Sequence, residues 1–234
     1  PLAIRWGDRI KPEQSFLDMV SFVDLAPTFL TVAGVVVPSE MQGRSLVELF
    51  DNGTQYEQAT GADADFVFSS RERHSSSRYD NWTYPQRAMR SHQHLLIRNF
   101  KPNRWPAGDP QKFDSPEQLG PEHGGYHDID ACPTLTVLVD GREESEIGPF
   151  FHLAVDHRPA WELFDILADP ACLNNLIDQK GNRYLQTRLQ RKMLSFLKET
   201  GDPRVGGDGD IWESYKRYSA IRKFPAPDSV PRSK

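Results

Sequence analysis

Residues 184–197 carry the strongest pattern in the chain, because their apolar side chains recur at the spacing of one helix face. The apolar positions are Tyr184, Leu185, Leu189, Met193, Phe196 and Leu197. Charged residues fill the opposite side, and Gly201 follows as a stop signal. An amphipathic helix buries its apolar face against another layer, so the sequence predicts a packed layer around this segment.

Short strands are predicted upstream of this helix. The stretch "DFVFSS" (65–70) indicates one strand, and "QRAMRS" with "HLLIRNF" indicates a hairpin that turns at residues 91–93. The residues expected on the buried face of the hairpin are Ala88, Leu95, Ile97 and Phe100. The stretch "WELFDILADP" predicts a last strand that ends in a turn.

The first 50 residues predict one strand and two helical segments. Residues 2–6 have a strand-like pattern, and residues 18–33 indicate a helix with a wide apolar face. Pro27 is best tolerated in a first helical turn, so the helix is expected to start or restart with Asp24 near its N-cap and to stop at Gly34. A short helical turn is expected at 45–50.

Two stretches without periodicity are expected to be connections. Residues 51–65 are polar and contain glycine, which is typical of a domain boundary. Residues 101–130 predict an ordered excursion over the surface. Of the tryptophans, Trp105, Trp161 and Trp212 are expected to pack, with Trp105 as the alternative candidate for stacking on a sugar ring.

Composition excludes several classes of function. The net charge of −5 gives no global attraction to nucleic acid or to an acidic membrane, so we expect neither as a partner. No apolar run approaches the roughly 20 residues that a membrane-spanning helix needs. Cys132 and Cys172 form neither a disulfide framework nor the paired spacing of a zinc site.

A basic loop, "FSSRERHSSSRYDNW" (68–82), is therefore a local feature and predicts a site for a local anion. The planar fork of arginine matches sulfate or carboxylate oxygens with two parallel hydrogen bonds. An alternative is that these arginines pair with Asp63, Asp65 or Asp80. Ser75, next to His74, does not establish a nucleophile, because adjacency in sequence does not place a base within reach and no G-x-S-x-G elbow is present.

The stretch "EHGGYHDID" (122–130) contains the densest set of possible metal ligands. The candidates are Glu122, His123, His127, Asp128 and Asp130. Their spacing matches no standard site, so a solvated turn is the favoured interpretation and no metal is predicted here.

Three ordered motifs resemble the sulfatase family. "SFVDLAPTFLTVAGVVVPSEMQGRSL" resembles the stretch that follows the core sheet of sulfatases, and "WELFDILADPACLNN" resembles a late signature of the family. Between them, "RAMRSHQHLLIRNFKPNRWPAGDP" is similar to the corresponding strands of sulfatases related to heparan N-sulfatase, or sulfamidase. The agreement runs from residue 1 to about residue 204.

The resemblance implies an α/β fold, α+β in its C-terminal part. Residues 1–58 would be the C-terminal end of an alkaline-phosphatase-like sulfatase domain. Residues 59–204 would be a smaller subdomain, in which an antiparallel sheet packs against the C-terminal amphipathic helix. Residues 205–234 would be a polar tail.

The chain departs from the family in its catalytic residues. The family's nucleophile is a cysteine or serine in C/S-x-P/A-x-R, converted to formylglycine, and its calcium site uses residues of the larger domain; no cysteine or serine here fits the pattern. Cleavage of a sulfate ester or sulfamate needs a strong nucleophile and a divalent cation. We therefore expect a fragment that is inactive alone, with no catalytic residue, metal or cofactor of its own, and with calcium and formylglycine in a missing N-terminal part.

The resemblance gives the basic loop a role. Arg71, Arg73 and His74, oriented by Glu72 and with Arg87 nearby, would contact a sulfated carbohydrate. Expected partners are this substrate, the missing N-terminal domain and, because apolar surface would be exposed, a second copy of the chain. A secreted, periplasmic or lysosomal-type compartment is favoured.

Two other functions remain open. One is a stand-alone module that binds an acidic ligand through the same loop, without a catalytic partner. The other keeps the fold and changes the reaction to the hydrolysis of phosphate or phosphonate esters. An upstream C-x-P-S-R motif would favour the sulfatase function over both.

Overall fold

The computed structural model describes residues 2–7, 9–16, 18–52 and 66–227. In chain order the elements are η1 (Phe22–Asp24), α1 (Leu25–Val32), α2 (Val47–Asn52), β1 (Val67–Arg71), η2 (Tyr79–Asn81), β2 (Gln86–Arg90), β3 (His94–Asn99), β4 (Phe113–Ser115), β5 (Gln118–Leu119), α3 (Pro133–Asp140), α4 (Gly148–Val155), β6 (Trp161–Asp165), η3 (Lys180–Asn182), α5 (Arg183–Glu199), α6 (Pro203–Gly206) and α7 (Ile211–Ser214). The expected domain boundary near residue 58 lies outside the described residues and stays a prediction.

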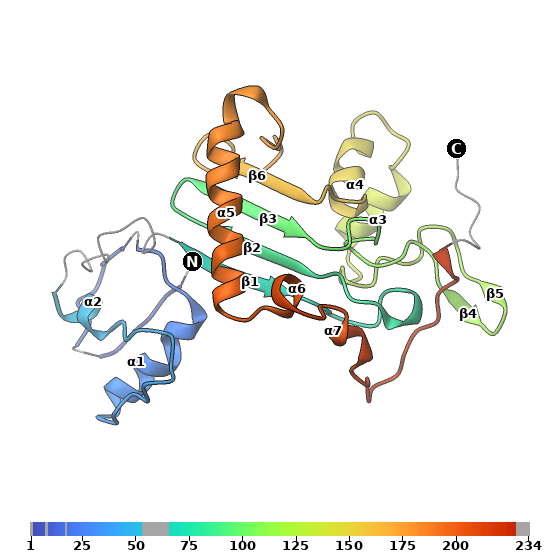
Figure 1. Cartoon of the computed structure of the whole chain (residues 1–234). Helices are drawn as coiled ribbons and strands as arrows, with labels where there is room; N and C mark the ends of the chain where they lie inside the picture. The colour runs from blue at the N-terminus through green and yellow to red at the C-terminus, as the bar shows by residue number, and fades with distance from the viewer. Residues whose placement is uncertain (1, 8, 17, 53–65, 228–234) are drawn as a thin grey trace.

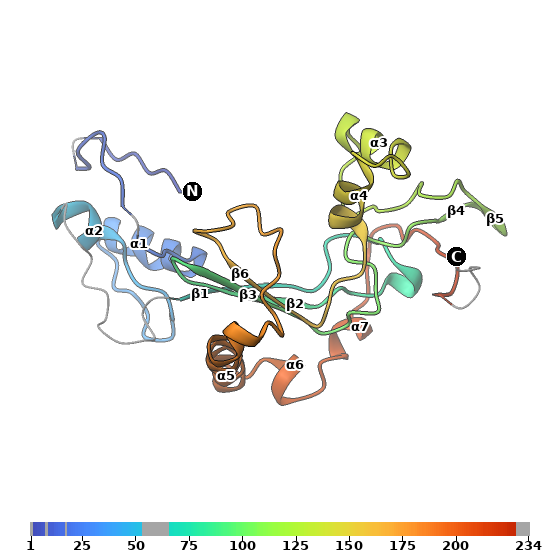
Figure 2. The same ribbon diagram turned by 90° about the horizontal axis from the view of Figure 1, so that it is seen from above.

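The central element is a four-stranded antiparallel sheet with the order β1-β2-β3-β6. Its register aligns a row of apolar side chains across all four strands, and α5 covers this face (Figures 1 and 2). The row consists of Phe68, Met89, Leu96 and Leu163. Leu189, Met193 and Leu197 of α5 pack against it, which confirms the predicted amphipathic helix and the sheet beneath it.

The predicted buried face of the β2–β3 hairpin was wrong for three residues. Ala88, Leu95 and Ile97 are only half-buried, whereas Met89 and Leu96 on the opposite face lie in the core. Both faces of the hairpin carry apolar residues, so alternation alone does not choose between them. The choice is made by α5, whose apolar face packs on the side of Met89.

The N-terminal region is held by the motif residues around α1. The helix starts with Asp24 as its N-cap, as predicted, and Gly34 ends it with a φ of 70°. The buried Asp24 carboxylate accepts hydrogen bonds from the backbone N–H groups of Ser21 (2.9 Å) and Arg44 (3.0 Å). The Thr28 hydroxyl accepts from the Leu46 N–H at 2.9 Å. These polar residues therefore fasten the segment that leads into α2.

The predicted strand at residues 2–6 was wrong, because these residues lie outside every ladder among the described strands. A strand needs a neighbour to satisfy its backbone groups, and the described part of the chain supplies none there. Trp6 instead packs against the cluster of Leu46, Leu49 and Phe50. The predicted helical turn at 45–50 is confirmed by α2.

Residues 101–158 form a second packed region beside the sheet. The excursion at 101–130 is ordered, as expected, and contains the β4–β5 hairpin. Helices α3 and α4 were not predicted from the sequence. They close a cluster of Ala107, Tyr126, Phe151 and Val155. Trp105 packs at its edge, 6.5 Å from Tyr126 between ring centroids, so it packs as expected.

After α5 the chain continues through α6 and α7 toward the β4–β5 hairpin (Figure 1). Helices α6 and α7 follow directly, and the backbone N–H of Phe113 in β4 donates to the Lys223 carbonyl at 2.9 Å. Phe224 is buried. Residues 203–224 therefore cover an existing surface. None of the described helices is long and apolar enough to cross a membrane.

Candidate functional site

The basic loop begins where β1 ends, at Arg71. Its course is fixed by a return contact in which the Tyr84 backbone N–H donates to the Glu72 carbonyl at 2.7 Å. Strand β2 starts two residues later and brings Arg87 beside Glu72, because Arg71 pairs with Gln86 in the register. The antiparallel pairing thus places three of the predicted site residues together.

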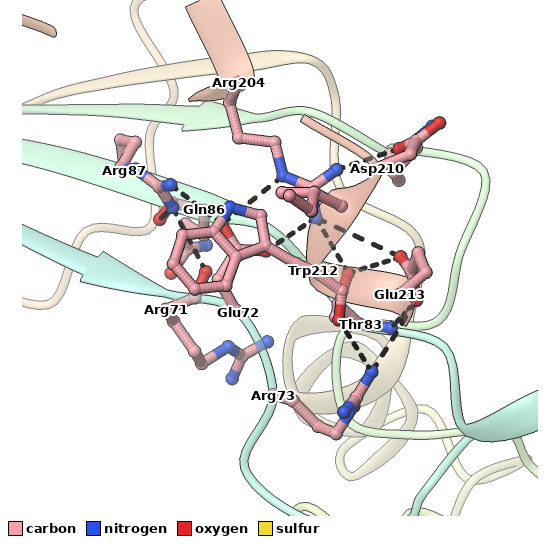
Figure 3. A network of polar contacts seen from close by, with 12 residues as sticks. Arg71, Glu72, Arg73, Thr83, Gln86, Arg87, Arg204, Asp210, Trp212 and Glu213 are labelled. Atoms are coloured by element: carbon pink, nitrogen blue, oxygen red, sulfur yellow. Dashed lines mark hydrogen bonds and ion pairs between the residues drawn. The ribbon is translucent and has the colours of Figure 1, made fainter. Parts of the chain in front are cut away.

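Glu72 is the centre of a network of ion pairs (Figure 3). Its carboxylate accepts from the Arg87 guanidinium at 2.8 Å and from that of Arg204 at 2.6 Å. Arg87 also donates through Nε to Asp202 at 2.5 Å, and Arg204 donates to Asp210 at 3.0 Å. This network joins β1, β2 and the segment after α5.

Arg73 reaches a second carboxylate in the same network. Glu213 of α7 accepts from the Thr83 hydroxyl at 2.6 Å and from Arg104 at 2.5 Å. The Arg73 guanidinium lies 3.8 Å from the same carboxylate and donates to the Trp212 carbonyl at 3.3 Å. Burial opposes ionisation of Glu213, but the bonds from Thr83 and Arg104 outweigh it and hold its pKa below the ordinary value.

Because each of these arginines faces a carboxylate, the network neutralises its own charge. Arg73 and Arg87 are therefore bonded within the protein rather than left open to a ligand. The sequence predicted that Glu72 orients Arg71, Arg73 and His74. Its carboxylate is hydrogen-bonded instead to Arg87 and Arg204. Asp80, proposed as an alternative partner, forms no ion pair with another described residue, while Asp63 and Asp65 lie outside the described residues.

A second cluster anchors the far end of the loop. The buried Arg78 guanidinium donates to Asp128 at 2.7 Å and, through Nε, to the Trp105 carbonyl at 2.6 Å. The Ser77 hydroxyl donates to the same carboxylate at 2.7 Å. The hydroxyl groups of Ser75 and Ser77 thus help to hold the Asp128 carboxylate in place. Among the described residues, the Asp128 carboxylate is hydrogen-bonded to Ser75, Ser77 and Arg78 and not to a histidine base, so the arrangement is structural rather than that of a nucleophile.

Arg71 differs from the other arginines. Its guanidinium donates to the Pro106 carbonyl at 2.9 Å and lies 5.1 Å above the Tyr84 ring. Among the described residues it forms no ion pair, and the carboxylate nearest in its surroundings, Asp128, is bonded to Arg78. Burial, followed by repulsion from Arg78, lowers the pKa of Arg71 from its ordinary value. The described polar contact of the Arg71 guanidinium is thus a carbonyl oxygen rather than a carboxylate.

His74 lies exposed at the tip of the loop. Its side chain forms no hydrogen bond with another of the described residues. The structure therefore leaves His74 exposed and Arg71 half-buried without an ion pair among the described residues, and assigns Glu72, Arg73 and Arg87 to internal support. Their roles toward a substrate stay predictions.

The possible metal ligands at 122–130 do not converge. Asp128 is bonded to Arg78 and Ser77, and the His123 Nδ1 atom pairs with the Tyr126 hydroxyl at 2.7 Å. Among residues 2–227, as far as the structure describes them, no group of three His, Cys, Asp or Glu side chains could hold a metal ion. The donor set here does not fit a calcium ion, because its buried carboxylate is already neutralised by arginine.

The residues that hold the loop in place were not predicted from the sequence. They are Arg78, Arg104, Asp128, Asp202, Arg204 and Glu213. Asp202 and Arg204 lie in "TGDPRV". An aspartate directly before a proline indicates the start of a helix, and Asp202 does cap α6 by accepting a hydrogen bond from the Arg204 N–H. Nothing in the local sequence links them to Glu72, 132 positions from Arg204.

Comparisons with known proteins find similarity to sulfatases. Residues 1–104 match the family model described as N-sulphoglucosamine sulphohydrolase, C-terminal. An ulvan-active sulfatase of Formosa agariphila is 27% identical over 209 residues, which cover 86% of this chain and 29% of that protein. The chain is similar to part of a sulfatase over most of its length. An N-acetylglucosamine-6-O-sulfatase of Bacteroides thetaiotaomicron is 25% identical to this chain over 92% of the chain and 27% of its own length.

Among solved structures, a 2-O GAG sulfatase is 16% identical to this chain with a TM-score of 0.43, over 82% of this chain and 28% of that protein. The chain spans between 27% and 33% of the length of the first three curated sulfatases that it matches. The resemblance inferred from the three motifs is confirmed. So is the mixed α/β fold, with its small antiparallel sheet and its C-terminal helix.

Proposed function

We propose that this chain holds a sulfated carbohydrate for hydrolysis of its sulfate ester or sulfamate, through Arg71 and His74. The single observation that carries the proposal is that Arg71 forms no ion pair among the described residues, while the local carboxylate is bonded to Arg78. A sulfate group bound by Arg71 would receive charge-assisted hydrogen bonds in a partly desolvated place. The names of the relatives, which act on ulvan and on N-acetylglucosamine sulfate, support the substrate class.

The supporting network explains why the loop is suited to this role. A side chain that binds an anion needs a fixed position, and Glu72, Arg87 and Arg204 fix the backbone from which Arg71 extends. We infer that the nucleophile and the calcium ion are supplied by the part of the sulfatase that these residues do not include. The described residues offer no site that fits the ion.

The test is a calorimetric titration of the full 234-residue chain with a sulfated disaccharide and with its desulfated counterpart. We expect preference for the sulfated form, and we expect Arg71→Ala to weaken its binding about tenfold, the value of one charge-assisted contact. Arg191→Ala is the matched control, because Arg191 is an exposed arginine of α5. Equal binding of both sugars by the unaltered chain would refute the proposal.

A phosphorylated disaccharide in the same titration separates the hydrolase classes. Stronger binding of the phosphorylated than of the sulfated sugar would favour a phosphate ester substrate instead. We also propose, on the family resemblance alone, that the protein works in a secreted, periplasmic or lysosomal-type compartment.

A further inference from the structure

A second group of basic residues lies beyond the loop, on the C-terminal segment and β4. Lys112, Arg222 and Lys223 line a shallow depression of about 390 Å³, together with Phe113 and Ile221. Lys112 pairs with Asp114, which leaves Arg222 and Lys223 without an ion pair among the described residues. The depression therefore carries two positive charges that no described carboxylate balances.

The depression is built rather than formed by loose side chains. Its floor is fixed where the Phe113 N–H donates to the Lys223 carbonyl at 2.9 Å. Arg222 is held from the other side, because its backbone N–H and its guanidinium donate to the hydroxyl and the carbonyl of Ser76, each at 3.0 Å. Ser76 belongs to the basic loop, so the depression and the position of Arg71 share one backbone segment.

The buried edge of this region contains an imidazole with a free nitrogen. The Nε2 atom of His127 is buried and has no hydrogen-bond partner among the described residues, and the ring lies 6.2 Å from that of Phe224. Burial, followed by Arg222 and Lys112, lowers the pKa of His127. Arg222 and Lys112 thus place positive charge near the His127 ring. Positive charge around this part of the depression favours an anion.

We propose that the depression of Lys112, Arg222 and Lys223 binds a second anionic group, a carboxylate or sulfate ester, on a neighbouring unit of an extended saccharide chain. This inference rests on the proposed function, because it extends the same ligand beyond the unit held at Arg71. It identifies the preferred substrate as an acidic oligosaccharide rather than a single sulfated sugar. Contacts of this kind would raise affinity with chain length.

The experiment compares calorimetric titrations of the full chain with a monosulfated disaccharide and a tetrasaccharide of alternating uronic acid and sulfated hexosamine. We expect the tetrasaccharide to bind about tenfold more tightly, and the double variant Lys112→Gln, Lys223→Gln to reduce that gain to about twofold while disaccharide binding stays unchanged. Lys180→Gln, an exposed lysine of η3, should keep the full gain.

A tetrasaccharide gain that survives the double variant, or no gain at all, would overturn this inference and leave the proposed function intact if the disaccharide still binds. Failure of both sugars to bind would defeat both proposals. A DNA oligonucleotide of equal charge that binds as tightly, and is weakened equally by the double variant, would show unselective attraction and overturn the inference. A desulfated tetrasaccharide that keeps the gain would assign the contact to a carboxylate, and one that loses it would assign it to a sulfate ester.

Discussion

The Glu72 carboxylate receives hydrogen bonds from two arginines whose side chains are almost completely buried, Arg87 at 6% and Arg204 at 3% exposure. Removing its charge leaves both guanidinium groups with fewer acceptors in a place that water reaches poorly. Breaking such a pair is costly, because an uncompensated buried charge remains.

We expect Glu72→Gln to lower the free energy of unfolding by about 2–3 kcal/mol, somewhat less than full burial would give because Glu72 is itself partly exposed. Urea denaturation followed by circular dichroism would measure it. The control is Glu143→Gln, because the Glu143 side chain is 90% exposed and lies 3.8 Å from its arginine, and it should change stability by less than about 0.5 kcal/mol. A loss no larger than that of the control would show that the network does not stabilise the fold.

Asp128 gives a pH dependence with a defined sign. Burial favours its protonated form, but Arg78 and Ser77 outweigh burial and hold the pKa of Asp128 below the ordinary value of 3.8. The stability that it contributes is therefore complete above this value and is lost as the pH falls through the lower pKa of the folded state. We expect the unfolding free energy to fall less steeply below about pH 4 in Asp128→Asn than in the unaltered chain. Parallel slopes in urea titrations at several acidic pH values would contradict this.

Among the elements, α5 contributes most to the core of the sheet layer, because Leu189, Met193 and Leu197 all lie on its buried face. Met193→Ala should lower the free energy of unfolding by about 2–4 kcal/mol through lost burial and a residual cavity. Leu194→Ala, one residue further and exposed, should cost less than about 1 kcal/mol. Urea midpoints compare the two, and equal losses would mean that the helix does not pack as described.

Elements with a periodic or punctuated sequence could be predicted, and the others could not. Helix α5, the hairpin and the restart of α1 at Asp24 follow from local patterns, because helix faces and caps are local properties. The buried face of the hairpin depends on which side of the sheet α5 covers, and α5 lies about 100 residues later in the chain. Helices α3 and α4 were not predicted although each has a proline in its first turn and α3 ends at Gly141. Both are short, and they pack at the cluster that contains Tyr126 and Phe151.

The candidate site shows the same division. The cationic loop was evident in the sequence, whereas which arginines are neutralised depends on distant carboxylates such as Asp128, 50 positions from Arg78, and Asp202, 115 positions from Arg87. Arg87 resembles Arg71 in sequence, since both stand in strands beside polar residues. Only the fold shows that Asp202 and Glu72 bind Arg87 and that Arg71 has no such partner.

At the scale of the whole molecule, the N-terminal region exposes an apolar surface. Phe22, Phe29 and Val36 are 84%, 66% and 88% exposed. Clustered exposed apolar side chains favour association, either with a further domain of a sulfatase or with a second copy.

We expect sedimentation velocity of the isolated chain to show concentration-dependent association, and the double variant Phe22→Ser, Phe29→Ser to reduce it. Tyr218→Ser removes an equally exposed aromatic from the opposite part of the chain and should leave association unchanged. A monomer at all concentrations would contradict the expectation that this surface is a contact.

The bond between Glu72 and Arg204 also bears on how the protein is made. During synthesis the basic loop leaves the ribosome about 130 residues before Asp202, Arg204 and Glu213 do, so its arginines have few acceptors for several seconds at ordinary elongation rates. In that interval the nascent loop is a cationic segment open to chaperones or to the ribosomal RNA surface. A chain that stopped before residue 202 would deprive Arg73 and Arg104 of Glu213 and Arg87 of Asp202, whereas Arg78 would keep Asp128.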